Sequence, residues 1–258
     1  MKDKVAFITG GGSGIGEATA RLLAQQGAKV IISGRTKEEL DAVVQAIRDG
    51  GGEALAVAAD ISNVDDVKDA YTQIVDTYGR LDIVFANAGV NGTWAPIDEL
   101  EPDEFRKTVD INLNGTFYTI KYAVPHLRER GGSVVVTSSV NGTRNFSNSG
   151  ATAYSSTKAA QVAMTKMLAL ELAKDRIRVN VICPGMIDTQ IEENTDHEDL
   201  DRAQVPVEYP AGKIPLTDGE PGSSAQVAQL VAFLASDASS LITGTEVWID
   251  GAQSLLQG

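Results

Sequence analysis

Short runs of apolar and β-branched residues recur along the chain, and longer segments with a helical spacing of apolar positions separate them. The runs are continuous rather than alternating, which is typical of strands buried on both faces of a sheet. They lie at Val5 to Ile8, Lys29 to Ser33, Ala54 to Ala58, Ile83 to Ala86, Ser133 to Thr137, Arg178 to Ile182 and Glu246 to Ile249. The intervening segments predict helices at Gly16 to Gln26, Lys37 to Arg48, Val64 to Tyr78, Asp103 to Arg128, Ala153 to Lys174 and Ala225 to Ala235.

Seven strands alternating with six helices predict a doubly wound parallel sheet of the α/β class, with helices on both faces. The 258 residues suit a single domain over 1–258, because no linker, low-complexity tract or internal repeat divides them. In this architecture ligands bind beyond the carboxyl ends of the strands. Residues at those strand ends are therefore the first candidates for a functional site.

Composition argues against several classes of partner. The formal charge of −13 repels a nucleic acid backbone and an anionic lipid surface. No apolar run approaches the roughly 20 residues that span a bilayer, and no signal peptide is evident, so we expect a cytoplasmic protein without a nucleic acid or membrane partner. Cys183, the single cysteine, cannot form an intrachain disulfide, and neither His126 nor His197 lies in a metal-ligand spacing. We expect no metal site and an inert core cysteine.

A glycine-rich turn follows the first strand, where Thr9 to Gly16 reads Thr-Gly-Gly-Gly-Ser-Gly-Ile-Gly. Glycines let the backbone approach a ligand closely, and the N-terminus of the next helix favours a pyrophosphate. The glycine spacing differs from the G-x-G-x-x-G fingerprint, and no Lys-Ser/Thr pair follows as in a nucleoside triphosphate loop. We predict a dinucleotide site here, with an ordinary strand-to-helix connection as the alternative. The predicted site residues are Gly10, Gly12, Ser13, Gly14, Ile15 and Gly16.

The second strand ends in Gly34-Arg35, where a dinucleotide fold often carries an acidic residue that holds the ribose 2′-hydroxyl. Arg35 can instead form charge-assisted hydrogen bonds with a 2′-phosphate, which favours NADP over NAD. The alternative is a solvated arginine paired with Glu38 or Glu39. Further small or polar residues at strand ends extend the predicted cofactor site: Asp60, Ile61, Asn87, Ala88 and Gly89.

Tyr154 and Lys158 lie four residues apart in a predicted helix and therefore share one face. A tyrosine hydroxyl has an ordinary pKa of about 10, and a nearby cation favours its charged form. This pair predicts a proton donor and acceptor, although a packed tyrosine ring beside a solvated lysine is the commoner meaning of such a spacing.

Five motifs, in this order, resemble the short-chain dehydrogenase/reductase family over essentially the whole chain. They are Thr9 to Gly16, Asn87 to Gly89, Asn112 within Asp-Ile-Asn-Leu-Asn, Ser139 ahead of Tyr154 and Lys158, and Pro184 to Thr189. The resemblance implies a Rossmann-type fold, nicotinamide chemistry and a homotetramer. It also implies that Pro184, Gly185, Ile187 and Thr189 contact the cofactor.

The resemblance implies a catalytic group of Asn112, Ser139, Tyr154 and Lys158. Tyr154 would protonate a carbonyl oxygen as hydride reaches the carbon, and Ser139 would hydrogen-bond the developing alkoxide. Lys158 would lower the pKa of Tyr154 and hold the nicotinamide ribose, and Asn112 would order a water. Two alternatives stay open: Asn112 could cap or kink its helix, and Ser138 competes with Ser139.

Two segments differ from the family pattern. The segment between Ser139 and Tyr154 is longer, so we expect a small insertion at 143–148. Phe146 could form an apolar wall there and Arg144 or Asn145 a polar contact, with exposed loop residues that have no role as the alternative. A substrate lid is expected within about 188–222, and its stretch from Asp188 to Asp201 holds seven carboxylates without a lysine or arginine. That charge would repel an anionic acyl carrier protein.

We therefore expect an oxidoreductase that interconverts a ketone and a secondary alcohol, with NADP preferred over NAD and a small neutral substrate. A 3-oxoacyl-carrier reductase is less favoured, although Arg130 matches one basic position that such enzymes use. An NAD-dependent polyol or sugar dehydrogenase is a further alternative. A dinucleotide-binding sensor or scaffold without turnover is the alternative outside the enzymes.

Overall fold

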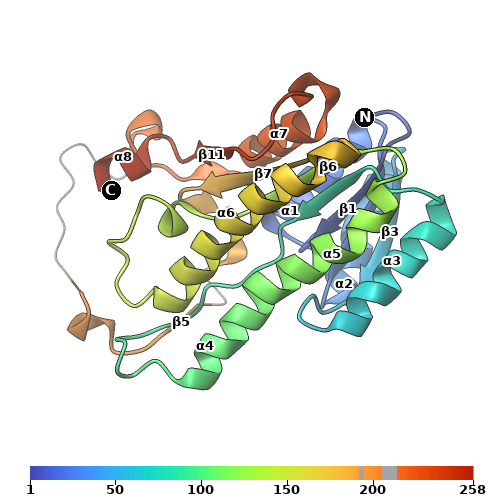
Figure 1. The fold of residues 1–258 in the computed structure, drawn as a ribbon. Helices are drawn as coiled ribbons and strands as arrows, with labels where there is room; N and C mark the ends of the chain where they lie inside the picture. Colours follow the sequence, from blue (N-terminus) through green and yellow to red (C-terminus); the bar gives the residue numbers. More distant parts are fainter. Residues whose placement is uncertain (192–194, 205–213, 258) are drawn as a thin grey trace.

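The computed structural model describes residues 1–191, 195–204 and 214–257. Seven parallel strands form the central sheet in the order β11-β7-β6-β4-β1-β2-β3 (Figure 1). The strands are β1 (Val5–Thr9), β2 (Lys29–Gly34), β3 (Glu53–Ala58), β4 (Ile83–Ala86), β6 (Gly132–Thr137), β7 (Ile177–Pro184) and β11 (Glu246–Ile249). The predicted α/β class and all seven predicted strands are confirmed.

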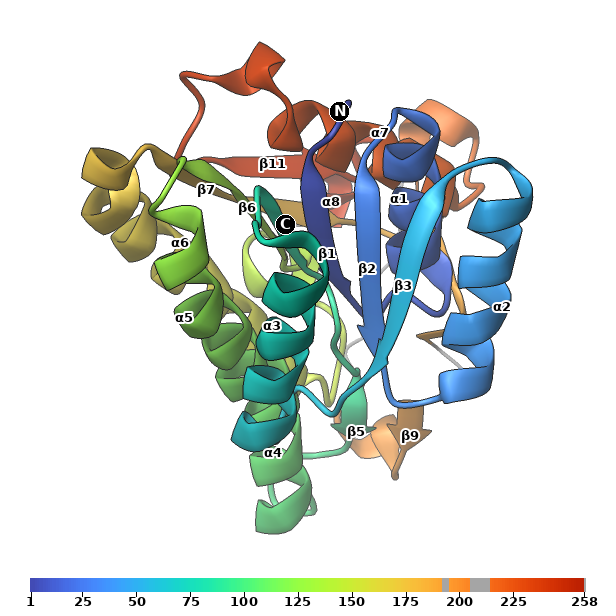
Figure 2. The same cartoon turned by 90° about the vertical axis from the view of Figure 1, so that its right-hand side faces the viewer.

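Helices cover both faces of this sheet, with α3, α5 and α6 on one side and α1, α2 and α7 on the other (Figure 2). The helices are α1 (Gly14–Gln25), α2 (Lys37–Asp49), α3 (Val64–Tyr78), α4 (Pro102–Val109), α5 (Gly115–Leu127), α6 (Thr152–Leu172), α7 (Ser224–Ala235) and α8 (Gln253–Gln257). None of the helices in the described part of the chain is long and apolar enough to cross a membrane.

Alternate residues of each strand belong to two separate cores, one on each face of the sheet. Phe7 and Ile31 pack with the helices of one face, whereas Ile8 and Ile32 pack with those of the other. Burial on both faces explains why these strands are continuously apolar in sequence.

The order of the strands creates a crevice at one edge. From β1 the chain adds β2 and β3 on one side, and then β4, β6, β7 and β11 on the other. At such a reversal the loops after β1 and β4 diverge and leave a space beyond the carboxyl ends of the strands. The predicted site residues lie around this space.

One predicted helix is divided into two. The segment expected as a single helix from Asp103 to Arg128 consists of α4, a π-helical turn at Asp110–Asn114 and α5. Asn112 lies in the middle of that turn. π-Helical turns inside α-helices frequently occur at functional sites.

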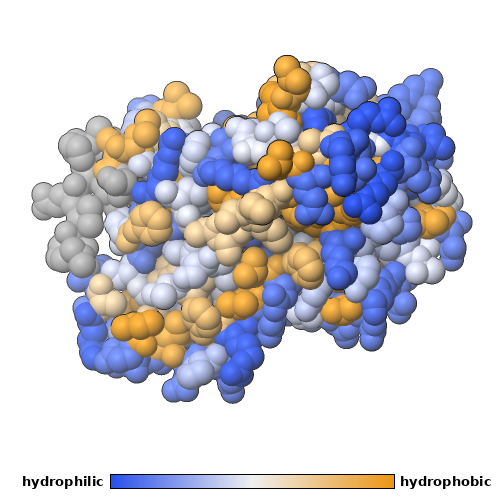
Figure 3. Space-filling view, viewed as in Figure 1, coloured by the Kyte–Doolittle hydropathy of each residue, from blue (hydrophilic) through white to orange (hydrophobic). Residues whose placement is uncertain are grey.

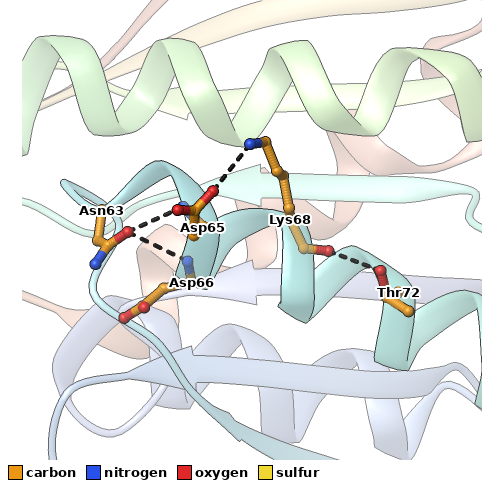
Figure 4. Close-up of polar contacts among 5 residues, drawn as sticks. All are labelled: Asn63, Asp65, Asp66, Lys68 and Thr72. Atoms are coloured by element: carbon orange, nitrogen blue, oxygen red, sulfur yellow. Dashed lines mark hydrogen bonds and ion pairs between the residues drawn. The ribbon is translucent and has the colours of Figure 1, made fainter.

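The N-terminus of α3 fixes one wall of the crevice. Asn63 Oδ1 accepts hydrogen bonds from the backbone N–H of Asp65 at 2.9 Å and of Asp66 at 3.4 Å (Figure 4). Asp66 in turn accepts a hydrogen bond from the backbone N–H of Asp60 at 2.9 Å. The helix cap thus holds Asp60, one of the predicted cofactor residues, at the end of β3.

Short strand pairs lie outside the central sheet and were not predicted. In one pair β5 (Gly92–Trp94) lies parallel to β9 (Thr195–His197), and in the other β8 (Ile187–Asp188) lies parallel to β10 (Gly222–Ser223). The first pair brings a segment of the expected lid beside the loop that follows β4. Parts of the expected lid and acidic stretch, 192–194 and 205–213, lie outside the described residues.

Candidate active site

A cleft of about 780 Å³ lies beyond the carboxyl ends of the central strands. It falls within the size range of ligand pockets. All of the predicted cofactor residues line it except Gly16. Of the predicted catalytic residues, Ser139, Tyr154 and Lys158 line it and Asn112 does not.

The glycine-rich turn needs glycine for two different reasons. Gly10 and Gly14 have φ values of +66° and +53°, a region that other residues rarely adopt. Gly16 has another role, because a Cβ on it would lie 2.0 Å from the carbonyl oxygen of Gly10. Gly16 therefore lets α1 start close against the turn and does not line the cleft.

Asn87 joins the ends of three strands below the cleft. Its Nδ2 donates to the carbonyl of Thr9 at 3.2 Å, and its Oδ1 accepts from Thr137 Oγ1 at 3.1 Å. Thr9 Oγ1 accepts the backbone N–H groups of Asn87 at 3.0 Å and Ala88 at 3.1 Å. These bonds hold the floor of the cleft in one arrangement.

Ser139, Tyr154 and Lys158 come together from two elements. Ser139 follows β6, and the other two lie one turn apart on α6, with Lys158 Nζ 5.4 Å from the centre of the Tyr154 ring. The sequence left Ser138 as an alternative to Ser139. Ser138 Oγ donates to the carbonyl oxygen of Lys158 at 2.8 Å, whereas Ser139 Oγ accepts the backbone N–H of Asn141 at 3.1 Å. The hydroxyl hydrogen of Ser138 is thus directed at α6.

Lys158 is a buried cation. Its side chain is 3% exposed, and Nζ donates to the carbonyl oxygen of Thr137 at 2.9 Å. Burial lowers the pKa of Lys158 from 10.5 to about 8, because the charged form loses its hydration. The ammonium form therefore predominates at neutral pH. Cys183 lies nearby, and burial raises the pKa of its thiol to about 11, so it is a neutral core group.

Asn112 supports the cleft wall from behind. Its side chain is fully buried and makes two hydrogen bonds of 2.8 Å with the backbone of Val90, one to the N–H and one to the carbonyl. Its own carbonyl accepts a hydrogen bond of 2.7 Å from Gln161 Nε2. The π-helical turn thus fastens the loop after β4, which lines the cleft, to α6.

The three residues named for the 143–148 insertion lie outside the cleft. Phe146 is 70% exposed, and Arg144 stacks on Trp248 at 3.6 Å from the ring centre. Asn145 is buried, and none of the three lines the cleft. Asn148, which the sequence analysis did not single out, lines it instead.

The wall beyond Ser139 and Tyr154 contains residues that the sequence did not reveal. Trp94 and Asn91 reach it from the loop after β4, and Met186 and Gln190 from the segment after β7. The Trp94 ring lies 6.4 Å from the Tyr154 ring and edge-on to His197 at 5.7 Å. In the sequence, the only signal for Trp94 was an aromatic residue that follows a strand. No pattern in the sequence indicated Asn91 or Gln190.

The opposite end of the cleft suits a nicotinamide dinucleotide. The glycine turn opens the N-terminus of α1 to a pyrophosphate, and Ala88 lies directly beside the turn, with its Cα 3.0 Å from a Cβ on Gly10. Arg35 lines this end, is exposed, and has no ion pair within the described residues. Glu39 lines it too, and its Oε2 would lie 3.1 Å from a Cβ on Gly12.

Comparison with known proteins agrees with this geometry. A family model described as enoyl-(acyl carrier protein) reductase matches residues 10–252. The cyclohexanol dehydrogenase of Acinetobacter sp. (strain SE19) is 38% identical, over 98% of this chain and 95% of its own.

Solved structures match over nearly the whole chain. A 3-ketoacyl-ACP reductase from Sinorhizobium meliloti 1021 superimposes with a TM-score of 0.94 at 50% identity, covering 98% of this chain and 99% of its own. A 3-ketoacyl-(acyl-carrier-protein) reductase from Brucella melitensis, solved with NADH, has a TM-score of 0.86 at 32% identity, with coverage of 98% and 99%. The chain belongs to the short-chain dehydrogenase/reductase family of oxidoreductases.

Proposed function

We propose that this protein interconverts a ketone and a secondary alcohol, with NADP as the preferred cofactor. The observation that carries the proposal is one cleft that holds Ser139, Tyr154 and the buried Lys158 at one end and the glycine-rich turn at the other. The bound cofactor supplies or accepts the hydride. The side chains of the chain handle the proton and the charge on the substrate oxygen.

Tyr154 is the proton donor in the reduction direction and the acceptor in oxidation. The Lys158 ammonium stabilises the phenolate that remains, and its burial strengthens that interaction because little water screens it. Ser139 Oγ donates to the substrate oxygen as negative charge develops there. Asn112 acts indirectly, through Val90 and the wall that it fastens.

Arg35 supports the preference for NADP. Its guanidinium is exposed at the dinucleotide end and unpaired within the described residues, so it is available to a 2′-phosphate. The carboxylate of Glu39 favours NAD as the second candidate, because it lines the same end and could accept a hydrogen bond from a ribose hydroxyl.

Reduction of a 3-oxoacyl group on a carrier protein is the second candidate for the substrate, favoured by the matched reductases named above. The basic residues at the surface support it weakly, since Arg128 pairs with Asp175 at 2.9 Å. The described part of the acidic stretch carries further carboxylates. A small neutral substrate remains our first proposal.

We also infer that the chain assembles with copies of itself. Phe105, Phe117, Met167 and Leu170 expose 39%, 44%, 71% and 82% of their surface on the α4, α5 and α6 layer. Figure 3 shows hydrophobic side chains gathered over these helices. Leu241 and Leu255 are exposed elsewhere on the molecule. The apolar surface over α4, α5 and α6 supports self-association, and we propose the homotetramer that the family resemblance implies.

The test is a panel of substrates assayed in both directions. Ketones and one 3-oxoacyl thioester are assayed with NADPH or NADH, and secondary alcohols and polyols with NADP⁺ or NAD⁺. The proposal predicts turnover of a neutral ketone with NADPH ahead of NADH. Tight NADPH binding without turnover of any panel member would favour a sensor and contradict the proposal.

A further inference from the structure

Two asparagine side chains form a pair at the substrate end of the cleft. Asn148 Nδ2 donates to Asn141 Oδ1 at 3.1 Å, and both residues line the cleft. Asn141 is 8% exposed, whereas Asn148 lies at the rim and is exposed. The pair joins the short helical turn after β6 to the loop before α6.

The pairing leaves one amide amino group and one amide carbonyl oxygen without a hydrogen-bond partner among the described residues. A primary amide carries two N–H donors and one carbonyl oxygen. Among the described residues, Asn141 Nδ2 and Asn148 Oδ1 have no other partner. If both amides are turned over, the roles exchange and one amino group and one carbonyl still remain. One free amino group and one free carbonyl oxygen are therefore present whichever of the two amides donates.

A hydroxyl is the neutral group that can hydrogen-bond to both the free amino group and the free carbonyl oxygen of the pair. It accepts from an amino group and donates to a carbonyl, whereas a ketone oxygen or an ether can only accept. A carboxylate would face the carbonyl oxygen with its own negative charge. The described residues that line this end of the cleft include no charged side chain besides Lys158, so a neutral ligand fits best.

The pair also lies next to the reacting position. The backbone N–H of Asn141 donates to Ser139 Oγ at 3.1 Å, and Ser139 is the proposed partner of the substrate oxygen. Asn141 lies two positions after Ser139, the proposed hydrogen-bond donor to the substrate oxygen. A hydroxyl held by the pair would therefore be a close neighbour of the reacting carbonyl.

We propose that the Asn141–Asn148 pair selects substrates with a hydroxyl adjacent to the reacting carbon, namely α-hydroxy ketones and vicinal diols. This inference rests on the proposed function. In reduction, hydride from NADPH adds to the carbonyl carbon and a proton to its oxygen. The products are a vicinal diol and NADP⁺, and the neighbouring hydroxyl is unchanged.

The test compares ketones that differ only in that hydroxyl: 3-hydroxy-2-butanone with 2-butanone, and 2-hydroxycyclohexanone with cyclohexanone. For the unmodified protein we expect kcat/KM to be about tenfold or more higher for the hydroxylated member of each pair, because its hydroxyl makes hydrogen bonds with the pair that the plain ketone cannot make. Equal values for both members would overturn the inference and leave the proposed function intact. Turnover of no ketone at all would overturn both.

Asn148→Leu removes the pair without disturbing the core, since Asn148 is exposed at the rim. We expect the preference to fall to about threefold or less, because kcat/KM should fall more for the hydroxylated ketones than for the plain ketones. Phe146→Ala, on the same loop but outside the cleft, is the matched control and should keep the preference. A preference that survives in Asn148→Leu, or an equal loss for both ketones, would show that the pair has only a structural role.

Discussion

Lys158 shows most directly how a single residue couples stability to chemistry. Its burial lowers its pKa to about 8, so the protein holds a charged group where a neutral one would be more stable. This cost is present below pH 8. Between pH 8 and 10.5 the unfolded chain binds more protons than the folded one, so the cost falls as pH rises.

Lys158→Met should therefore stabilise the protein at pH 7 while abolishing turnover. Removing the pKa shift contributes about 3 kcal/mol, and loss of the hydrogen bond to Thr137 costs about 1 kcal/mol, which leaves a net gain of about 2 kcal/mol. Urea unfolding at pH 7 and pH 10 measures the difference in free energy of unfolding between the variant and its parent, and this difference should be smaller at pH 10. Lys174→Met is the control, because Lys174 is exposed in the short helical turn that follows α6. A Lys158→Met variant less stable than its parent at pH 7 would refute the burial argument.

Arg35 determines the cofactor preference in this account. Arg35→Asp places a carboxylate where we expect the 2′-phosphate, so the ratio of kcat/KM for NADPH over NADH should fall about 100-fold. Steady-state kinetics with both cofactors provide the measurement. Glu39→Gln is the matched variant at the same end of the cleft and should lower activity with NADH only. An unchanged ratio in Arg35→Asp would remove Arg35 from the cofactor site.

Among the elements, the strands were predictable and the π-helical turn was not. Burial on both faces makes each strand a continuous apolar run, which is a local signal. The π-helical turn at Asp110–Asn114 depends on hydrogen bonds from Asn112 to Val90 and from Gln161 to Asn112. Those partners lie 22 and 49 positions away in the sequence, so local periodicity cannot reveal them.

The cap of α3 offers a test at the scale of one element. Asn63→Ala leaves the N–H groups of Asp65 and Asp66 without their side-chain acceptor and should cost about 1 kcal/mol. Asn63→Asp keeps an acceptor and should be nearly neutral. Urea unfolding of both variants decides the point. Equal stability of Asn63→Ala and its parent would mean that water replaces the cap.

At the scale of the whole molecule, the sequence predicted the sheet and the cofactor side of the cleft better than the substrate side. Cofactor residues follow buried strands directly, so their places come from the order of the elements. Trp94 lies in the short strand β5, Asn141 in a short helical turn and Asn148 in a loop. The paths of these segments depend on tertiary contacts, such as the pairing of β5 with β9. For the same reason the sequence pointed to Phe146, which faces away from the cleft.

Assembly is a property of the whole molecule that solution measurement can test. Light scattering should give four times the 27.2 kDa chain mass at micromolar concentration. Leu170→Asp places a charge on the exposed face of α6 and should reduce that mass, because a buried unpaired charge opposes association. A monomer for the unmodified protein would contradict the tetramer.

The central claim is that Tyr154 moves the proton in a nicotinamide-dependent reaction. The most direct measurement compares the parent protein with Tyr154→Phe, using the best ketone of the panel and fluorescence titration of NADPH. We predict an unchanged Kd for NADPH and a fall in kcat of about 100-fold or more, since general acid catalysis contributes that much. A Tyr154→Phe variant that binds NADPH and keeps at least half of the parent kcat would contradict the account.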